Sequence, residues 1–405
     1  MGSAESRRSV SFGSGGRRRG PLIFGMIAAF AACLAEAGAQ GITEYPLPTS
    51  GSQPSRITAG PDGNLWFTES GFTQVGRITT SGTVTEFSTP SYAGDITAGP
   101  DGNLWFVEPF VNRIGQITPS GAVLEFPVPT EGNPTSIASG PDGNLWFMQV
   151  WTLGLLHHNY VGRLTPWGEF TIFGPTAGAG VCGHIAPGPD GALWFTCNQP
   201  IEGRFLYENR IARISTSGDV IAVTTMRYGP RELTVGPDGG LWFTLRPAGE
   251  IGQSAPDFAL TEFSVGGSPI GIAAGPDGNL WFLDDAANTV IRFSTQGQVI
   301  GTFSIPTTAS GPTDIIVGPD GNLWFTEQAA NKIATMSPFV PTPRPTPTLP
   351  ERRLPRPVHR LARLHNTVAV AEKVSCSHPT VSLRKRGLIR AEGGFVTDAG
   401  LRCTR

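Results

Sequence analysis

The chain contains the stretch Gly60-Pro61-Asp62-Gly63-Asn64-Leu65-Trp66-Phe67, and the pattern Gly-Pro-Asp-Gly-x-Leu-Trp-Phe occurs in it seven times. Seven of the nine tryptophans lie inside this motif. Repeats of about 40 residues indicate a solenoid, a propeller or an array. The first glycines of the seven motifs are Gly60, Gly99, Gly140, Gly188, Gly236, Gly275 and Gly318.

Each repeat has the pattern of four short strands. In the first repeat, β-type segments at residues 57–59 and 65–67 flank Pro61-Asp62-Gly63, where Pro presets φ and Gly is free to adopt φ > 0. Alternating segments follow at residues 75–78 and 84–87. Four strands per 40 residues are typical of a propeller blade, so the sequence predicts an all-β, seven-bladed β-propeller over residues 41–339.

The propeller is expected to close through its N-terminal segment. The seventh repeat lacks a fourth strand, and residues 42–48 have the pattern of the fourth strands of other repeats. Pairing the two removes a free sheet edge. A large aliphatic residue three positions before each motif glycine is expected to pack between blades with the motif Trp. These residues are Ile57, Ile96, Ile137, Ile185, Leu233, Ile272 and Ile315.

The two ends of the chain differ from the repeats. Residues 1–39 combine Arg17-Arg18-Arg19, an apolar run and the cleavage pattern Ala37-Gly38-Ala39, which predicts a signal peptide and export. Ser6-Arg7-Arg8 also resembles a twin-arginine signal, so the export pathway stays open. Residues 340–350 form a Pro-rich linker. Residues 351–405 are predicted to be a disordered basic tail, with a small binding module as the alternative.

Charge is distributed unevenly along the chain. The total is −2, but 13 Lys and Arg against 4 acids after residue 340, and an excess of 3 positive charges before residue 40, leave −14 for residues 40–340. An acidic body argues against a nucleic-acid partner. No apolar run reaches the roughly 18 residues of a membrane span. We expect an exported, monomeric protein.

A disulfide is predicted in the fourth repeat. Cys182 lies six positions before Gly188 and Cys197 nine positions after it, so the hairpin brings the two cysteines nearly opposite each other. Export favours their oxidation.

Two neighbouring repeats have longer connections between their second and third strands. The span from the motif Leu to the following Asn is 8 positions in the second repeat, 14 in the third and 16 in the fourth. Their apolar side chains predict a binding wall for a small molecule, a glycan or a protein, while packing of the loops on each other is an equal alternative. The predicted ligand-binding residues are Trp151, His157, His158, Phe205 and Tyr207.

Polar residues recur at two further positions of the repeat. Four positions before the motif glycine stand Arg56, Asp95, Ser136, His184, Glu232, Gly271 and Asp314, and nine after it stand Glu69, Glu108, Gln149, Cys197, Leu245, Asp284 and Glu327. We expect both sets on the face with the long connections. The acids of the second set would lie near a central opening, where they form a hydrated rim or hold Mg²⁺ or Ca²⁺.

The repeats resemble the virginiamycin B lyase (streptogramin lyase) family of seven-bladed propellers over about 300 residues, through units such as Ile57-Thr58-Ala59 followed by Gly60 to Glu69. The resemblance implies a reaction that opens a cyclic depsipeptide by elimination. A His removes the proton beside the ester carbonyl, Mg²⁺ held by carboxylates stabilises the enolate, and the ester C–O bond breaks.

One of the five functional positions implied by the resemblance is matched. The metal-binding Glu of the last blade corresponds to Glu327, and Asp284 is the equivalent acid one repeat earlier. The family's histidines enter the last two blades at positions that read Ile270 and Thr313 here. The other two positions, a second metal-binding Glu and a ligand-contacting Tyr, are Gly311 and Ser55.

The sequence therefore predicts an exported propeller that binds a ligand on its long-connection face, with catalysis left open. The first alternative is a carbon–oxygen lyase that opens a cyclic ester from a relocated site around His184, His157 or His158 and the acidic rim, with His184 as the candidate base and Mg²⁺ as a cofactor. The second alternative is a structural or adhesive surface protein attached through its basic tail.

Overall fold

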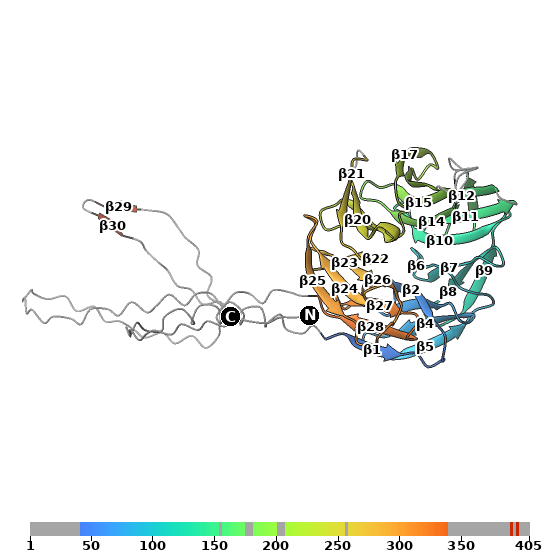
Figure 1. The fold of residues 1–405 in the computed structure, drawn as a ribbon, viewed down its shortest axis with the longest axis horizontal. Helices are drawn as coiled ribbons and strands as arrows, with labels where there is room; N and C mark the ends of the chain where they lie inside the picture. Colours follow the sequence, from blue (N-terminus) through green and yellow to red (C-terminus); the bar gives the residue numbers. More distant parts are fainter. Residues whose placement is uncertain are drawn as a thin grey trace, which may run out of the picture. The chain divides into compact units, whose positions relative to one another are not determined.

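The computed structural model describes residues 41–153, 156–174, 181–200, 207–255, 258–338, 389–391 and 394–396. The chain divides into two units, Met1–Thr342 and Pro343–Arg405. The first is a ring of seven four-stranded antiparallel sheets, which confirms the predicted seven-bladed propeller (Figure 1). In the second, β29 (Ile389–Ala391) and β30 (Gly394–Val396) form an antiparallel pair. Within these described ranges, no helix has the length and apolar character needed to cross a membrane.

The predicted signal peptide at residues 1–39 and the linker at residues 340–350 lie outside the described residues, as does most of the tail. The signal peptide, the linker and the disordered tail therefore stay predictions.

Each blade runs from an inner strand at the ring centre to an outer strand at the rim. The first three blades are β2 (Pro54–Ala59), β3 (Leu65–Glu69), β4 (Gln74–Ile78), β5 (Val84–Ser88); β6 (Ile96–Ala98), β7 (Leu104–Glu108), β8 (Arg113–Ile117), β9 (Val123–Pro127); and β10 (Asn133–Ser139), β11 (Leu145–Leu153), β12 (Leu156–Leu164), β13 (Phe170–Phe173). The next two are β14 (Val181–Pro187), β15 (Leu193–Pro200), β16 (Tyr207–Ile214), β17 (Val220–Met226); and β18 (Leu233–Val235), β19 (Leu241–Leu245), β20 (Glu250–Ser254), β21 (Leu260–Ser264), with a 3-10 turn at Arg246–Ala248. The last two are β22 (Pro269–Ala274), β23 (Leu280–Asp284), β24 (Thr289–Phe293), β25 (Val299–Ser304); and β26 (Pro312–Val317), β27 (Leu323–Glu327), β28 (Lys332–Met336), β1 (Thr43–Pro46).

The motif turn is built around the Trp side chain. Trp66 is fully buried, and its Nε1–H donates to Asp62 Oδ1 at 3.0 Å. A Cβ on Gly60 would lie 2.4 Å from the Trp66 ring, so only glycine fits there. Gly63 has φ +75°, which glycine adopts without a steric penalty. The same Trp–Asp hydrogen bond is present in all seven blades.

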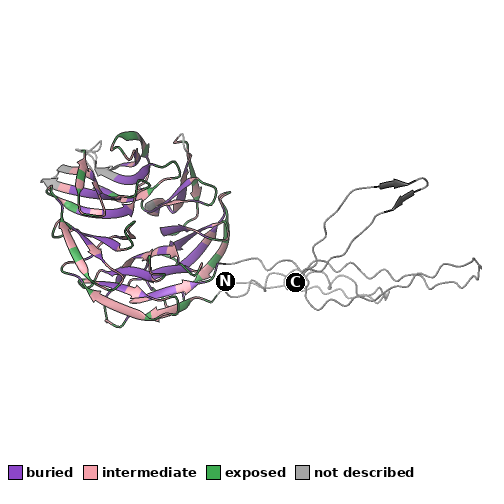
Figure 2. Ribbon diagram, turned by 180° about the vertical axis from the view of Figure 1, so that it is seen from behind, coloured by how far each residue is buried: buried purple, intermediate pink, exposed green. Residues whose placement is uncertain are grey.

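The core lies between blades. Trp66 packs with Ile96, Leu104 and Phe106 of the next blade, as the position of the aliphatic residue predicts. Buried residues accordingly follow the inner and middle strands around the ring (Figure 2).

The ring closes as predicted, through β1. This strand pairs antiparallel with β28, from Thr43 opposite Thr335 to Pro46 opposite Lys332. Tyr45 stacks on Trp324 with ring centroids 5.8 Å apart, in the same way that Phe87 stacks on Trp66 at 5.3 Å. The first and last blades are thus joined in one sheet.

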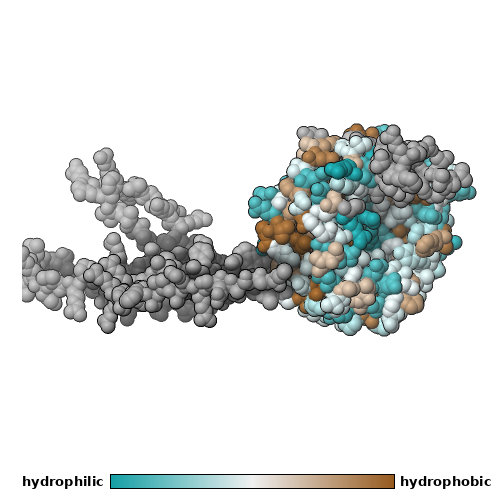
Figure 3. Space-filling model, viewed as in Figure 1, coloured by the Kyte–Doolittle hydropathy of each residue, from teal (hydrophilic) through white to brown (hydrophobic). Residues whose placement is uncertain are grey.

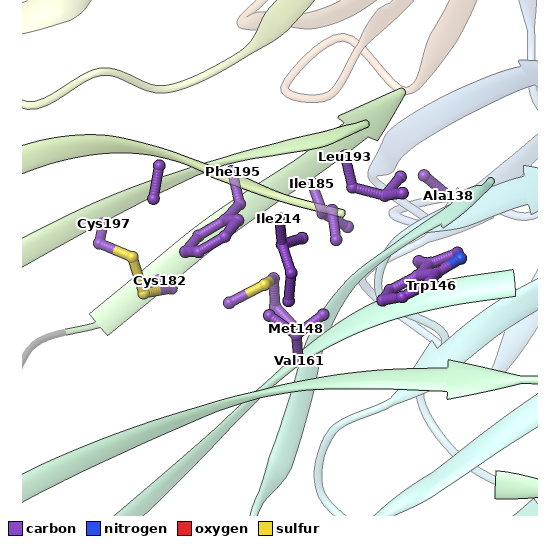
Figure 4. Close-up of a cluster of buried hydrophobic side chains, with 11 residues drawn as sticks. Ala138, Trp146, Met148, Val161, Cys182, Ile185, Leu193, Phe195, Cys197 and Ile214 are labelled. Atoms are coloured by element: carbon purple, nitrogen blue, oxygen red, sulfur yellow. A yellow bond between two sulfur atoms is a disulfide. The ribbon is translucent and has the colours of Figure 1, made fainter. Parts of the chain in front are cut away.

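The fourth blade contains the predicted disulfide. Cys182 and Cys197 are directly opposed on β14 and β15, and they are bonded to each other inside a hydrophobic cluster (Figure 4). A register shift follows immediately, between Cys182 and His184. The middle strands of the third and fourth blades are 8 or 9 residues long, against 5 in the other blades, so their hairpins extend further.

Candidate functional site

Inner-strand residues surround a cavity of about 430 Å³ at the centre of the ring. At five of the seven positions that lie four residues before a motif glycine, a charged or titratable side chain lines this cavity. These five residues, each from a different blade, are Arg56, Asp95, His184, Glu232 and Asp314. The middle of the propeller face in Figure 3 is correspondingly hollowed and largely hydrophilic.

Some residues at this position tie neighbouring blades together. Asp314 Oδ2 accepts a hydrogen bond from the Ile57 N–H of the next blade at 3.0 Å. Asp95 Oδ2 accepts from the Ile137 N–H at 3.0 Å and from the Ser136 hydroxyl at 2.7 Å. Asp95 and Asp314 therefore have structural roles that their position alone did not reveal.

Three other residues form an ion-paired triad across the cavity. Glu232 Oε1 lies 2.5 Å from Arg56 Nη1, and Glu232 Oε2 lies 2.9 Å from His184 Nε2. Burial opposes ionisation of Glu232, but Arg56 and His184 outweigh it and hold the pKa of this carboxyl below its usual range. Burial likewise opposes protonation of His184, and the Glu232 carboxylate outweighs it, so the pKa of His184 is raised. The Glu232 carboxylate therefore lies between Arg56 and His184 and pairs with both.

Burial also affects His184 Nδ1 and the Asp314 carboxyl in the cavity. His184 Nδ1 is buried and has no hydrogen-bond partner among the described residues. Burial raises the pKa of Asp314 to about 7, with Arg56 acting in the opposite direction. At the equivalent position the sixth blade has Gly271, with φ +55°, where a Cβ would come within 3.2 Å of Asp314 Cα.

The acids nine positions after the motif glycine do not line this cavity. Glu69, Glu108 and Glu327 are fully buried, and Asp284 is 4% exposed. They lie on the same side of their strands as the motif Leu and Phe, which pack against the preceding blade, so they face the space between blades. The expected acidic rim at the central opening is therefore wrong, both as a carboxylate ring and as a hydrated surface.

The metal role predicted for Glu327 and Asp284 stays a prediction. Asp284 Oδ1 already accepts hydrogen bonds from the Ser268 and Ala287 N–H groups, each at 3.0 Å. The described part of the chain contains no group of three or more His, Cys, Asp or Glu side chains suited to hold a metal ion.

The residues present do not fit the Mg²⁺ site that the family resemblance implies. Glu327 supplies one carboxylate, but the second is replaced by Gly311, whose φ is +61°. A Cβ on Gly311 would come within 2.9 Å of the Ala329 Cβ, which leaves no space for a longer side chain.

The family's histidine positions serve packing in this chain. Thr313 Oγ1 donates to the Ser55 carbonyl at 2.9 Å and shares a 2.6 Å hydrogen bond with Thr326 Oγ1. Ile270 packs against a buried hydrophobic cluster. Neither residue is able to remove a proton from a substrate near neutral pH.

The long hairpins bring together some of the predicted binding residues. Trp151 on β11 lies opposite His158 on β12, and their rings stack with centroids 5.3 Å apart. His157 and Tyr207 are placed in β12 and β16, but their side chains are not described. Phe205 lies outside the described residues. Its role and those of His157 and Tyr207 stay predictions.

Sequence reasoning missed an aromatic pair at the same end of the propeller. Phe110, in the β7–β8 connection, is 77% exposed, and its ring lies 5.2 Å from that of Tyr92. Burial raises the pKa of Tyr92, and the charge of Arg56 partly offsets this. The sequence signal that could have revealed this pair is Phe110 itself, an aromatic residue in a short connection between strands.

The comparisons with known proteins agree with this fold. The structure of a streptogramin B lyase is 27% identical over 73% of this chain and 97% of its own, with a TM-score of 0.64. Virginiamycin B lyase from Staphylococcus aureus is 28% identical over 74% of this chain and 99% of its own, also with a TM-score of 0.64. A catalytically inactive variant of the S. aureus enzyme, solved with quinupristin, has the same identity and coverage and a TM-score of 0.65.

A more distant match shows the fold alone. The WD40 β-propeller domain of Doa1 is 12% identical over 74% of this chain and 97% of its own, with a TM-score of 0.56.

The sequence profile of the virginiamycin B lyase family matches residues 31–155, 94–265 and 148–340, which together span all seven blades. The chain therefore belongs to the virginiamycin B lyase family.

Proposed function

We propose that this protein binds a ligand with apolar or aromatic groups on the face that carries the long hairpins, without the ring-opening reaction that the family resemblance implies. One observation carries the proposal. The two positions expected to hold the catalytic His are Thr313, which is hydrogen-bonded between blades, and Ile270, which is partly buried and packs against a hydrophobic cluster. The face nevertheless keeps a cavity and unusually exposed aromatic side chains.

The binding surface combines two kinds of contact. The Trp151–His158 stack and the Tyr92–Phe110 pair offer flat rings, which bind apolar or aromatic groups at low entropic cost. The Arg56–Glu232–His184 triad offers charged groups within the cavity. Pockets that are mostly apolar with a few fixed polar groups are typical ligand sites.

The relocated lyase has less support. A general base must be unprotonated to accept a proton, and the ion pair with Glu232 favours the protonated form of His184. The Nε2 atom of His184 is also occupied by that carboxylate.

Fluorescence titration of the full mature chain tests the binding proposal, with quinupristin as the probe because a relative was solved with it. Replacing Trp151 or Phe110 by Ala should weaken binding about tenfold or more, as loss of an aromatic anchor commonly does. Trp167 provides the matched control, because it is 72% exposed but lies in the turn between β12 and β13, at the opposite end of its blade. The Trp167→Ala variant should bind like the wild type. Equal affinity of the wild type and the Trp151, Phe110 and Trp167 variants would contradict the proposed surface.

A further inference from the structure

Three blades contain a pair of carboxyl groups of the same design. In each, a fully buried Glu at the end of the second strand lies near a Glu of the outer strand in the same blade. The pairs are Glu69 with Glu86, Glu108 with Glu125, and Glu327 with Glu44. Neither carboxylate oxygen of Glu69, Glu108 or Glu327 receives a hydrogen bond from any described residue. Buried carboxylates without partners are costly, so each pair needs a compensating group.

In two of the blades the protein supplies a cation. The residue directly opposite the buried Glu on the third strand is Arg113 in the second blade and Lys332 in the seventh. Arg113 Nη1 lies 2.6 Å from Glu125 Oε2, and Lys332 Nζ lies 2.6 Å from Glu44 Oε2. These two pairs are therefore at least partly neutralised from within the chain.

The first blade has the same frame without the cation. Glu86 accepts hydrogen bonds from the Thr49 N–H and hydroxyl, just as Glu44 does from Thr307. However, Gln74 is the residue opposite Glu69, and its Oε1 is buried and unpartnered among the described residues.

Ser52 is a further neighbour of Glu69 that lowers the pKa of this carboxyl, but burial outweighs it. The Ser52 hydroxyl also lies 3.0 Å from the Thr49 carbonyl and 3.0 Å from Asn331 Oδ1. Glu69 and Gln74 are thus opposed, and Glu86 is a charged neighbour of Glu69. Three buried oxygen atoms of Glu69 and Gln74 have no hydrogen-bond partner among the described residues.

We propose that the first blade binds a divalent cation, Ca²⁺ by its chemistry, through Glu69, Gln74 and Glu86. Ca²⁺ takes carboxylate, amide and water oxygens in flexible geometry, and its charge matches two carboxylates. Opposed residues on antiparallel strands have Cβ atoms about 4.5 to 5.5 Å apart, which lets Glu69 and Gln74 share one ion. The site is independent of the proposed ligand-binding face, and no step of any reaction is assigned to it.

Thermal unfolding of the chelator-treated mature chain at pH 7.5, with and without CaCl₂, tests the site. Binding to the folded state alone should raise Tm by about 5 °C when free Ca²⁺ is a hundred times its Kd. Isothermal titration should give one tight Ca²⁺ per chain.

Three variants separate this site from other acidic surfaces. Glu69→Gln should abolish the Ca²⁺-dependent rise in Tm, while Glu108→Gln, in the blade that already contains Arg113, should leave it unchanged. Gln74→Lys should supply the ammonium group found in the seventh blade, so that Tm becomes independent of Ca²⁺ even if Glu69→Gln does not fold.

Two results would overturn the proposal. One is a wild-type Tm that ignores Ca²⁺ and only falls as pH rises through 7, because Glu69 would then be compensated by a proton. The other is a Ca²⁺ response that persists in both Glu69→Gln and Gln74→Lys.

Discussion

The spaces between blades and the central cavity are built from the same seven repeats but differ in how strictly they repeat. Every blade buries the same Trp against its neighbour and bonds it to the same motif Asp. At the cavity, by contrast, equivalent positions hold Arg56, His184, Glu232 and a glycine. Packing against a neighbour restricts a position to one shape, whereas a side chain facing the cavity has no such partner. The repeated part therefore carries stability, and the variable part is free to carry function.

Deleting the closing strand should lower the stability of the propeller more than any other change proposed here, because it breaks the repeated packing between blades. A chain that starts at Thr49 loses β1 with Tyr45 and the buried Leu47. Burial of two such side chains contributes about 3 to 6 kcal/mol, and an open sheet edge is added. A chain that starts at Gln40 keeps β1 and should unfold like the full 405-residue chain. Equal unfolding temperatures for the two truncated chains would show that β1 does not close the ring.

Removing the disulfide should rank second. The Cys182–Cys197 bond closes a loop with a sequence separation of 15, for which chain entropy gives about 3 kcal/mol. Replacing both cysteines by Ser should lower the unfolding free energy by up to that amount, as measured by urea denaturation. Reduced wild type should behave like the double variant, and a stable reduced protein would contradict this estimate.

Breaking the cavity triad should have a moderate effect. Arg56→Met leaves the Glu232 carboxylate with His184 alone, and loss of one partner of a mostly buried pair should destabilise the fold by about 2 kcal/mol. Adding Glu232→Gln should recover part of the loss, because it removes the unpaired charge. A double-mutant cycle measures this coupling, and strict additivity would mean that the two residues do not interact.

The two regions should also respond differently to pH. Burial raises the pKa of Glu69 and Glu327 to about 7 and that of Glu108 to about 8, above the ordinary value of 4.5. Their contribution to stability is complete below pH 4.5 and is lost as pH rises through 7 to 8. Glu232 in the cavity has a lowered pKa, so its contribution is present above pH 4.5 and lost as pH falls further.

Calcium-free protein should therefore be most stable near pH 4.5 to 5, with a Tm that falls by a few degrees as pH rises from 5 to 8. Glu108→Gln should reduce this fall. A flat Tm over that range would contradict the raised pKa values of the buried acids.

Much of the repeated part could be predicted from the sequence. The strand pattern of residues 57–87, the closing segment and the opposed cysteines all follow from local rules of turns and alternation. The alternation of side chains along a strand also predicts that Glu69 is buried, although we expected it at the central opening. Glu69 is two residues from Phe67 and therefore faces the same buried side of the strand.

The cavity was less accessible to sequence reasoning. Arg56 and Glu232 are 176 residues apart in the chain, and only closure of the ring brings them within 2.5 Å of each other. Which of the equivalent residues form ion pairs and which bond the next blade depends on side-chain geometry. The Tyr92–Phe110 pair was missed for the same reason, since its members come from two different connections between strands.

The most direct test of the account is a search for turnover. Purified mature protein, quinupristin and Mg²⁺ should be incubated at pH 7.5, and the ring-opened product should be quantified by chromatography against a no-protein control. Loss of a general base commonly costs about 10² to 10⁴-fold in rate, and here Ile270 and Thr313 offer none. We expect no ring opening above the control. Mg²⁺-dependent opening that disappears in His184→Ala would contradict the account and establish a relocated lyase site.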